Sequence, residues 1–396
     1  MNETLNRTYL RSHPWITFKV DLRGGSPNFW IALGEAKSKC DHLADVPLKP
    51  DTAEELHRLY LVKGVLATTA IEGNTLTEED VQKLIDGTLR LPESKEYLAQ
   101  EVQNILDASN EILERIKSRN TEPITPALIK RFNAAVLKGI KQEEFVVPGE
   151  YSKVQVGAGR YKGAPVEDFE FLIDKLCAWI NGPDFDAPPG MELGYGIIKA
   201  ALTHLYLVWI HPFGDGNGRT ARLLEVKILM EAGAPSAAAH LMSNYYNRTR
   251  TEYYRKLDKT SESGGDALLF LLYAINGFVE ELREQIKAIR AQTWEVAWEN
   301  FVHECFQGRR SPAQARRRRL TLAISLAPAD DGWIEIRKLR TITPELAIEY
   351  SGKTPKTITR DINELVGMKL VDRVGQKVRA KKERILAFRS VILPQP

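Results

Sequence analysis

Cysteine is scarce in this chain, with only Cys40, Cys177 and Cys305 among 396 residues. The three lie far apart and form no Cys-x-x-Cys spacing, which argues against a disulfide framework or a zinc site. Long apolar runs are also missing. The longest nearly apolar stretch, residues 267–274, is shorter than the ~20 residues that span a bilayer, and residues 1–7 contain no apolar signal core. These absences predict a cytoplasmic protein with no membrane segment.

The formal net charge of +3 conceals two regions of opposite sign. Residues 309–396 carry 20 Lys and Arg against 9 Asp and Glu, a net +11, whereas residues 1–308 carry 35 against 43, a net −8. An acidic body with a basic tail indicates that the tail meets a polyanion. The run 309–319, rich in arginine, is expected to link the two parts.

Apolar periodicity predicts a mainly α protein. Helices are expected over residues 51–70, from 77, and over 96–118, 126–140, 167–181, 191–210, 219–232, 249–259 and 266–290. The pattern changes at 153–166, where alternating residues flank a glycine-rich tip, and we expect a β-hairpin. The predicted domains are an N-terminal helical region (1–115), a helical core with the hairpin (116–305) and a small α+β domain (306–396).

The residues with functional groups suited to catalysis lie in a loop between two expected helices. Residues 211–222 read His-Pro-Phe-Gly-Asp-Gly-Asn-Gly-Arg-Thr-Ala-Arg. The glycines let the backbone approach a ligand, and the start of the next helix offers unpaired N–H groups to an anion. Asp215 supplies an oxygen for Mg²⁺, while Arg219 and Arg222 share a helix face over that anion. A neutral His211 has the chemistry to accept a proton from a hydroxyl, so the loop predicts nucleotidyl transfer.

This segment resembles the Fic signature, His-x-Phe-x-Asp/Glu-Gly-Asn-Gly-Arg-x-x-Arg, at every fixed position. The resemblance implies a Fic-type helical core and a protein adenylyltransferase. His211 would be the general base for a Ser, Thr or Tyr hydroxyl of a target protein, and Asp215 would hold the Mg²⁺ of ATP. Arg219 and Arg222 would hold the β- and γ-phosphates. The other residues implied to bind phosphate are Gly214, Gly216, Asn217 and Gly218.

The resemblance extends to both sides of the loop. Residues 153–166 resemble the family's flap, which would hold a target segment by strand addition at Val154, Gln155 and Val156. The arginine that usually precedes the flap is Ser152 here. Downstream, 243–257 resembles the adenine-pocket region and implies that Tyr254 and Asn247 contact ATP. A helix that simply buries aromatic residues explains this last pattern equally well.

Residues 68–74, Thr-Thr-Ala-Ile-Glu-Gly-Asn, resemble the family's inhibitory motif. A carboxylate can form a bidentate pair with an arginine. The resemblance implies that Glu72 pairs with Arg222 and withholds it from ATP, with Thr68, Gly73 and Asn74 completing the motif. The alternative is that Glu72 is an exposed acid at a helix end.

Residues 320–390 resemble a winged helix-turn-helix. We expect a strand from Trp333, a helix over 343–352, a second helix from Thr354 and wing strands over 369–374 and 381–388. The residues predicted to contact DNA are Lys356, Thr357, Thr359 and Arg360. Dimerisation or protein contacts through this domain remain the alternative, and a homodimer stays open.

Two other functions remain compatible with the sequence. The chain could be a transcriptional regulator in which the Fic fold only senses nucleotide. The same loop could also transfer UMP or another phosphate-containing group, or remove AMP. The presence of both His211 and Asp215 favours the adenylyltransferase.

Overall fold

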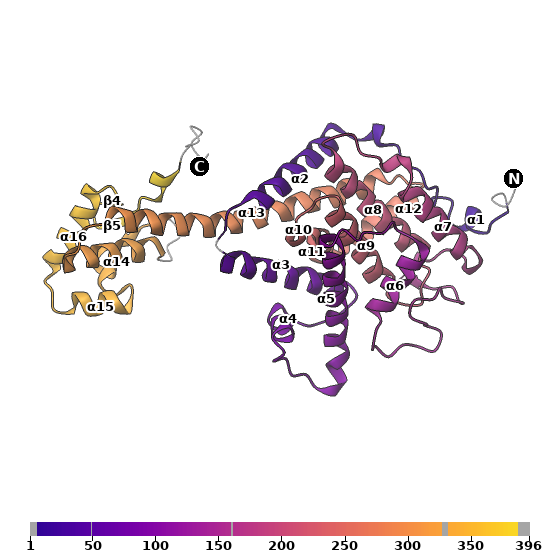
Figure 1. Cartoon of the computed structure of the whole chain (residues 1–396), viewed down its shortest axis with the longest axis horizontal. Coiled ribbons are helices and arrows are strands. Elements are labelled where there is room, and N and C mark those ends of the chain that lie inside the picture. The colour runs from indigo at the N-terminus through magenta and orange to yellow at the C-terminus, as the bar shows by residue number, and fades with distance from the viewer. Residues whose placement is uncertain (1–5, 49, 160, 327–331, 387–396) are drawn as a thin grey trace. The chain divides into compact units, whose positions relative to one another are not determined.

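The computed structural model describes residues 6–48, 50–159, 161–326 and 332–386 (Figure 1). The chain divides into two compact units, Met1–Ile286 and Lys287–Pro396. The first is helical apart from one two-stranded hairpin, and the second combines helices with a three-stranded antiparallel sheet. A mainly α fold with a hairpin and a small C-terminal α+β domain is therefore confirmed.

The helices up to the end of the first unit follow the periodicity of the sequence closely. In chain order they are α1 (Tyr9–Ser12), α2 (Pro27–Asp45), α3 (Pro50–Ala70), α4 (Glu78–Ile85), α5 (Glu96–Lys117), α6 (Pro126–Val136), α7 (Phe169–Ile180), α8 (Glu192–Ile210), α9 (Asn217–Glu231), α10 (Ser236–Ala239), α11 (Leu241–Arg248), α12 (Arg250–Glu262) and α13 (Leu268–Cys305). The short 3-10 turns are Leu22–Gly24, Glu93–Lys95, Val166–Asp168 and Pro183–Phe185. No expected helix covered α1, α2, α10 or α11, because irregular aromatics and a run of alanines hide their period.

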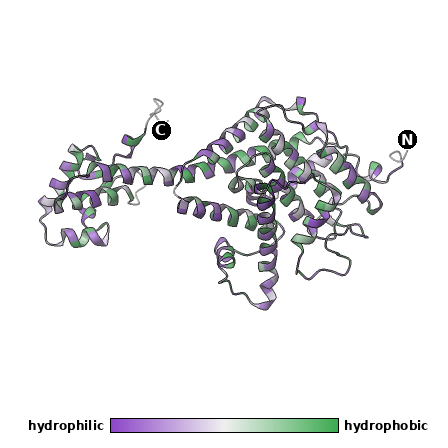
Figure 2. Cartoon of the chain, viewed as in Figure 1, coloured by the Kyte–Doolittle hydropathy of each residue, from purple (hydrophilic) through white to green (hydrophobic). Residues whose placement is uncertain are grey.

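The core of the first unit is built around α8. Almost every residue of α8 is buried, and α9 packs along it, with α5 and α6 against the other side of α9. Hydrophilic and hydrophobic residues alternate along most of the surrounding helices, as expected when one face packs inward (Figure 2). In the described part of the chain, α8 alone has the length and composition to cross a membrane, and 89% of its apolar window is buried inside the protein.

The domain boundaries differ from those expected. Residues 1–115 form no separate domain, since α3 and α5 pack on α9 and share its core through Val65, Ile105 and Leu224. The second unit begins at Lys287 rather than 306, because α13 runs on without a break and its Trp298 and Val302 belong to the second core.

The second unit contains α14 (Pro312–Leu326), β3 (Ile334–Glu335), α15 (Pro344–Ser351), α16 (Pro355–Gly367), β4 (Val371–Val374) and β5 (Lys377–Ala380), with 3-10 turns at Ile336–Thr341 and Lys382–Ile385. Its strands lie in the order β3-β5-β4. Val374 pairs with Lys377, so the two residues Gly375 and Gln376 form the turn, and Gly375 takes a positive φ of 56°.

Two expectations about this unit were wrong. The second wing strand lies at 377–380, because the tight turn at Gly375 starts it early, and a 3-10 turn replaces it from 382. Residues 387 and 388 of that expected strand lie outside the described residues. The basic run 309–319 is no simple link, since most of it forms the start of α14, where Arg316 and Arg317 pair with the buried Asp361 of α16.

Candidate active site

His211 ends α8 in a left-handed conformation, with φ 52° and ψ 55°. Its Nδ1 lies 3.3 Å from the carbonyl oxygen of Val208. A carbonyl can only accept, so Nδ1 carries the proton and Nε2 keeps its lone pair. Burial lowers the pKa of His211 below its usual 6.5, outweighing the Val208 bond and the charges of Glu72 and Asp215. The imidazole is therefore neutral near pH 7 and able to accept a proton.

The flap, residues 153–166, is held against His211 by the carbonyl groups that end α8. Its strands β1 (Gly157–Ala158) and β2 (Tyr161–Lys162) pair in antiparallel fashion. The Tyr161 hydroxyl donates to Trp209 O at 2.8 Å, and Ala164 N donates to Ile210 O at 3.0 Å. These bonds satisfy carbonyls that a helix end leaves unpaired. A Cβ atom at Gly163 would stand 2.8 Å from the His211 Cβ, so only glycine allows this close approach.

The three flap residues predicted to bind a target occupy the segment before β1. Val154 is 47% exposed, and Gln155 donates from Nε2 to Gly163 O at 2.9 Å. Val156 O accepts from Gly163 N at 2.8 Å. Ser152, which replaces the usual arginine, anchors this segment through its backbone N–H to Pro212 O at 2.8 Å and its hydroxyl to Val154 O at 2.7 Å.

The loop after His211 is held closed by two asparagines. Asn217 accepts from Phe213 N at 3.0 Å and donates to Phe213 O at 2.7 Å. Asn133 of α6 donates to Asp215 O at 2.9 Å and accepts from Gly149 N at 3.0 Å. Since both ends of the Asn217 amide are engaged, its side chain holds the loop, and its own N–H is the group left for an anion.

The start of α9 forms an anion site. Within the described ranges, the N–H groups of Asn217, Gly218 and Arg219 donate to no protein acceptor. Arg222 is 1% exposed, yet its Nε and Nη1 find no partner among the described residues. A Cβ atom at Gly218 would lie 3.0 Å from Arg222 Nη1 and would collide with Glu72 Oε1. Unpaired donors around a helix start that has a glycine at its second position suit a phosphate group.

Glu72 follows α3 and places its carboxylate over this helix start. Arg222 Nη2 donates to Glu72 Oε1 at 2.5 Å and to Thr68 O at 2.9 Å. Burial disfavours the charged form of Glu72, but Arg222, then Arg219, outweigh it, so the pKa of Glu72 is lowered. The structure contains the predicted ion pair between Glu72 and Arg222. Thr68 takes part through its carbonyl, since its hydroxyl donates to Gly64 O at 2.9 Å.

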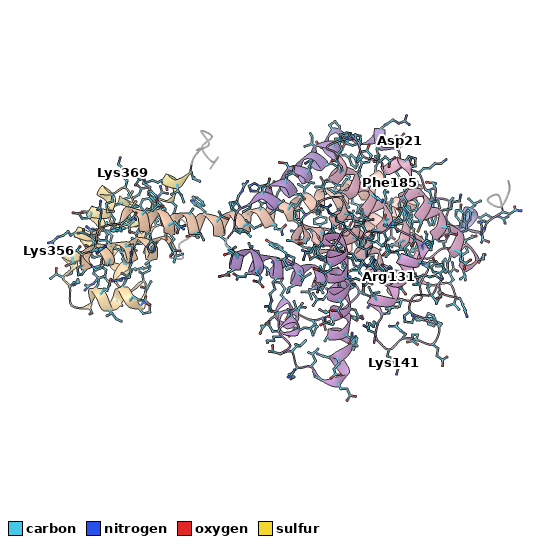
Figure 3. The ribbon with its side chains drawn as sticks, viewed as in Figure 1. Asp21, Arg131, Lys141, Phe185, Lys356 and Lys369 are labelled. Atoms are coloured by element: carbon cyan, nitrogen blue, oxygen red, sulfur yellow. The ribbon has the colours of Figure 1, made fainter. Side chains whose placement is uncertain are left out.

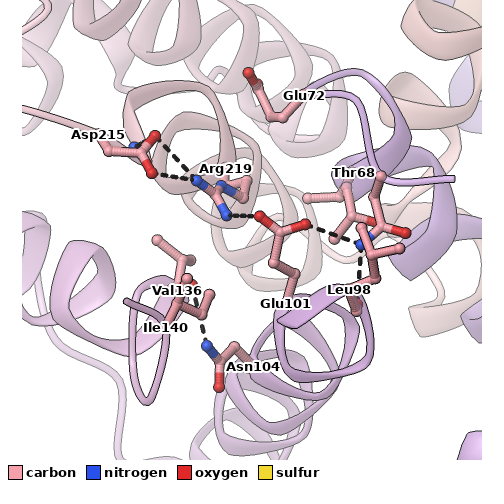
Figure 4. A network of polar contacts seen from close by, with 12 residues as sticks. Thr68, Glu72, Leu98, Glu101, Asn104, Val136, Ile140, Asp215 and Arg219 are labelled. Carbon is pink, nitrogen blue, oxygen red and sulfur yellow. Dashed lines mark hydrogen bonds and ion pairs between the residues drawn. The ribbon is translucent and has the colours of Figure 1, made fainter. Parts of the chain in front are cut away.

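Arg219 is turned away from the helix axis and lies between two carboxylates (Figure 4). Its Nη2 donates to Asp215 Oδ1 and Oδ2 at 3.0 and 2.9 Å, and its Nη1 donates to Glu101 Oε1 at 2.7 Å. Asn74 donates from Nδ2 to Glu101 Oε2 at 2.9 Å and to Leu98 O at 2.9 Å. Gly73, with φ 104°, provides the turn that brings Asn74 to α5.

The donor set around Asp215 fits Mg²⁺ bound together with a nucleotide. No group of three His, Cys, Asp or Glu side chains able to hold a metal occurs among the described residues. The Asp215 side chain is 47% exposed at the mouth of the anion site. Mg²⁺ is commonly bound by one or two carboxylates together with substrate phosphates. A single exposed Asp beside a phosphate cradle meets that requirement.

A cavity of ≈ 420 Å³ lies between the flap and α12. It is lined by Ala158, Gly159, Tyr161, Val208, Trp209, Arg250, Tyr254, Leu257 and Asp258. Tyr254 is 37% exposed, which leaves its ring accessible to a planar ligand. Asn247 lies on α11 and is not among the lining residues, so the structure brings Tyr254 to this cavity but not Asn247.

The residues predicted to contact DNA lie on α16 in the second unit. Lys356 and Arg360 are exposed, and Thr357 and Thr359 are half-buried. Lys356 projects outward, as does Lys369 after the end of the helix (Figure 3).

Sequence reasoning missed Asn133 and Glu101. Asn133 is fully buried among the apolar positions of α6, and a polar residue on such a face was the available signal. Glu101 gave no such signal, because acids are common on helices such as α5. Its role follows from a contact between residues 118 positions apart.

The fold and the site together define a class of protein, namely a helical domain that presents a phosphate cradle and two arginines beside a neutral imidazole. Residues 123–229 match the Fic/DOC family. The segment that carries Glu72 lies before the matched residues.

Among curated relatives, the chain is 28% identical over 241 residues to "Protein adenylyltransferase Fic" of Nematostella vectensis, covering 61% of this chain and 52% of the relative. It is 28% identical over 263 residues to "Protein adenylyltransferase fic-1" of Caenorhabditis elegans, covering 66% and 47%. The chain thus spans about half the length of the curated relatives it matches.

Solved structures show the same fold. A Fic family protein from Desulfovibrio desulfuricans aligns with a TM-score of 0.55 at 20% identity over 90% of this chain and 96% of the other. Fic-1 of C. elegans aligns with a TM-score of 0.52 at 24% identity over 67% and 73%.

Proposed function

We propose that this protein is an adenylyltransferase that transfers AMP from Mg²⁺-bound ATP to a Ser, Thr or Tyr hydroxyl of a target protein. The observation that carries the proposal is the state of the α9 start. Three N–H groups and the buried Arg222 Nη1 lack partners there among the described residues, directly after the loop that begins with the neutral His211. The curated relatives named protein adenylyltransferases support the reaction type.

The reaction needs little covalent chemistry from the protein. The target hydroxyl loses its proton to His211 Nε2 while its oxygen bonds to the α-phosphorus, and the bond from that phosphorus to pyrophosphate breaks. The N–H groups of Gly218 and Arg219 and the guanidinium of Arg222 stabilise the phosphate oxygens. The ring of Tyr254 would lie along the nucleobase in the cavity beside the flap. Mg²⁺, held by Asp215, would neutralise phosphate charge.

Glu72 acts as a brake in this proposal. Its carboxylate takes the position over Gly218 that a phosphate would need, and it occupies Arg222 Nη2. ATP meets repulsion from this carboxylate and finds Arg222 already paired. Transfer requires that Glu72 leave the helix start.

The test is mass spectrometry of the Glu72→Gly protein, incubated with Mg²⁺ and each nucleoside triphosphate, alone and in a lysate. We expect a gain of one AMP with ATP on the protein itself or on a lysate protein, at least ~10²-fold above wild type, because one transition-state donor is worth about that factor. The matched control is Glu72→Gly with His211→Ala, which should bind ATP without transfer. Labelling no higher than in wild type contradicts the brake, and labelling that survives His211→Ala contradicts the assigned base.

The same experiment separates the other chemistries. A gain of UMP with UTP would identify a uridylyltransferase, and loss of AMP from a modified target would identify the reverse role. Nucleotide binding with no transfer from any donor would favour a sensor. A tyrosine ring accepts any planar base, so the choice of ATP rests on the curated relatives, which are named protein adenylyltransferases.

We also propose that the second unit is a winged helix whose α16 contacts DNA in the cytoplasm. Two short helices precede a two-stranded hairpin, and Lys356 and Arg360 are exposed on the second helix. The basic charge of residues 309–396 supports a polyanionic partner.

A further inference from the structure

Glu101 joins two segments of the site that are far apart in sequence. It lies on α5, its side chain is 15% exposed, and its two oxygens serve different partners. Oε1 accepts from Arg219 Nη1 at 2.7 Å, and Oε2 accepts from Asn74 Nδ2 at 2.9 Å (Figure 4). A carboxylate is required for this arrangement, because each partner offers an N–H donor and a carboxylate accepts at both oxygens.

Carboxylates compensate the buried positive charge of Arg219. Its side chain is 4% exposed, and a guanidinium does not lose its proton in proteins. It donates to Asp215 and Glu101, and its Nε has no partner among the described residues. A buried charge that loses its partner is strongly destabilising. If Asp215 turns toward a metal ion, Glu101 remains as the direct carboxylate partner of Arg219.

We propose that Glu101 is a positioning residue that releases Asp215 for metal binding by compensating the charge of Arg219. The inference rests on the proposed function. With Glu101 present, Arg219 stays fixed at Nη1 while Asp215 exchanges its ion pair for Mg²⁺. Without the Glu101 charge, Arg219 has Asp215 as its nearest carboxylate, the pair tightens, and Asp215 becomes a poorer ligand.

The predicted signature is a loss of affinity that depends on the metal. Glu101→Gln in the Glu72→Gly protein should raise the Kd of ATP in Mg²⁺ about tenfold, at the lower end of the effect of residues that support metal ligands. The Kd of ATP in EDTA should not rise, because removing one negative charge near the phosphates favours the anion. Displacement of a fluorescent ATP analogue measures both values without requiring transfer.

The matched control is Glu114→Gln on the same helix, where Glu114 pairs with Lys117 at 2.9 Å and is 71% exposed. It should leave both Kd values unchanged. A rise in Kd in both Mg²⁺ and EDTA would mean general damage to the site and would overturn the inference, as would equal Kd values for the Glu101→Gln variant and its parent. If the Glu72→Gly parent itself fails to bind Mg²⁺-ATP, the proposed function falls as well, and binding by the parent separates the two failures.

Discussion

Two arginine pairs in this molecule differ in how completely their nitrogen atoms are hydrogen-bonded. Arg219 and Arg222 begin α9, and Arg316 and Arg317 lie on α14. On α14 both arginines converge on Asp361, where Arg316 Nε and Arg317 Nε donate at 2.7 and 2.9 Å. The Tyr350 hydroxyl adds a third donor to that carboxylate at 2.8 Å.

On α9 the arrangement is incomplete. Arg219 Nε and Arg222 Nε and Nη1 are buried without partners among the described residues, whereas neither Arg316 nor Arg317 has such an atom there. Buried donors are nearly always satisfied in native proteins, so three unsatisfied nitrogens together at one helix start are available to a ligand or to water. The difference between the pairs therefore distinguishes a structural cluster from a candidate binding site, and it depends on partners that lie far away in the sequence.

The largest effect is expected from breaking the complete cluster. Asp361→Ala removes the buried carboxylate that Arg316 and Arg317 share, leaves only the exposed Glu364, among the described residues, at 3.8 Å from Arg317 Nη1, and should destabilise the second unit by about 3–5 kcal/mol. Hydrogen exchange measured by mass spectrometry on the full chain should show faster exchange in α14–α16. Glu345→Ala, which changes an exposed first-turn acid of α15, should leave the exchange of α14–α16 nearly unchanged. Unchanged exchange in the Asp361 variant would remove the structural role of that cluster.

Removing an arginine of the α9 pair should instead lower the rate of AMP transfer. In the Glu72→Gly protein, Arg222→Ala should lower AMP transfer by about 10²–10³-fold, the usual effect of losing one donor to a developing charge. The melting temperature should not fall as it does for Asp361→Ala, because Arg222 already has unsatisfied nitrogens among the described residues. Initial rates of radiolabel incorporation measure the effect. An unchanged rate together with a lowered melting temperature would make Arg222 structural.

The third prediction concerns exposed basic residues of the second unit, which have no buried carboxylate partner like that of Arg316 and Arg317 in the described part of the chain. If α16 lies on DNA, Lys356→Ala and Arg360→Ala should each reduce the slope of log K against log salt by ~0.9, since each neutralises one phosphate. Fluorescence anisotropy with random duplex DNA gives the slope. Lys259→Ala, on the exposed face of α12 in the first unit, should leave it unchanged. Equal slopes for all variants would place the DNA surface elsewhere or exclude it.

The smallest effect concerns pH. The pKa of Glu72 is lowered in the folded protein, so its pairing stabilises the fold above the unfolded pKa and is lost as pH falls through the folded value. Wild type should therefore lose more melting temperature between pH 7 and pH 4 than Glu72→Gln. Equal losses by thermal denaturation would show that the pair with Arg222 contributes no pH-dependent stability.

Local pattern determined much of the fold. The 3.6-residue period predicted most helices of the first unit to within a few residues, and Thr77 with Asp80 marked the start of α4 by a capping box that the structure contains. Predictions from local sequence failed where a side chain pairs with a residue far away in the sequence. The basic run 309–319 gave no local sign that Arg316 and Arg317 turn inward. The expected contact of Asn247 with the nucleotide came from the resemblance of residues 243–257 to an adenine-pocket region and stays a prediction.

The sequence by itself determined which chemical groups this protein has: an imidazole after an apolar helix, a glycine-rich loop, two arginines one turn apart and an acid at 72. Those features follow from spacing along the chain, which a helix converts directly into a shared face. Only the tertiary structure decided which of these groups are paired with other side chains and which are left without a partner among the described residues. Contacts such as those of Arg222 with Glu72 and of Arg219 with Glu101 join residues 150 and 118 positions apart, and they depend on how α3 and α5 pack against α9.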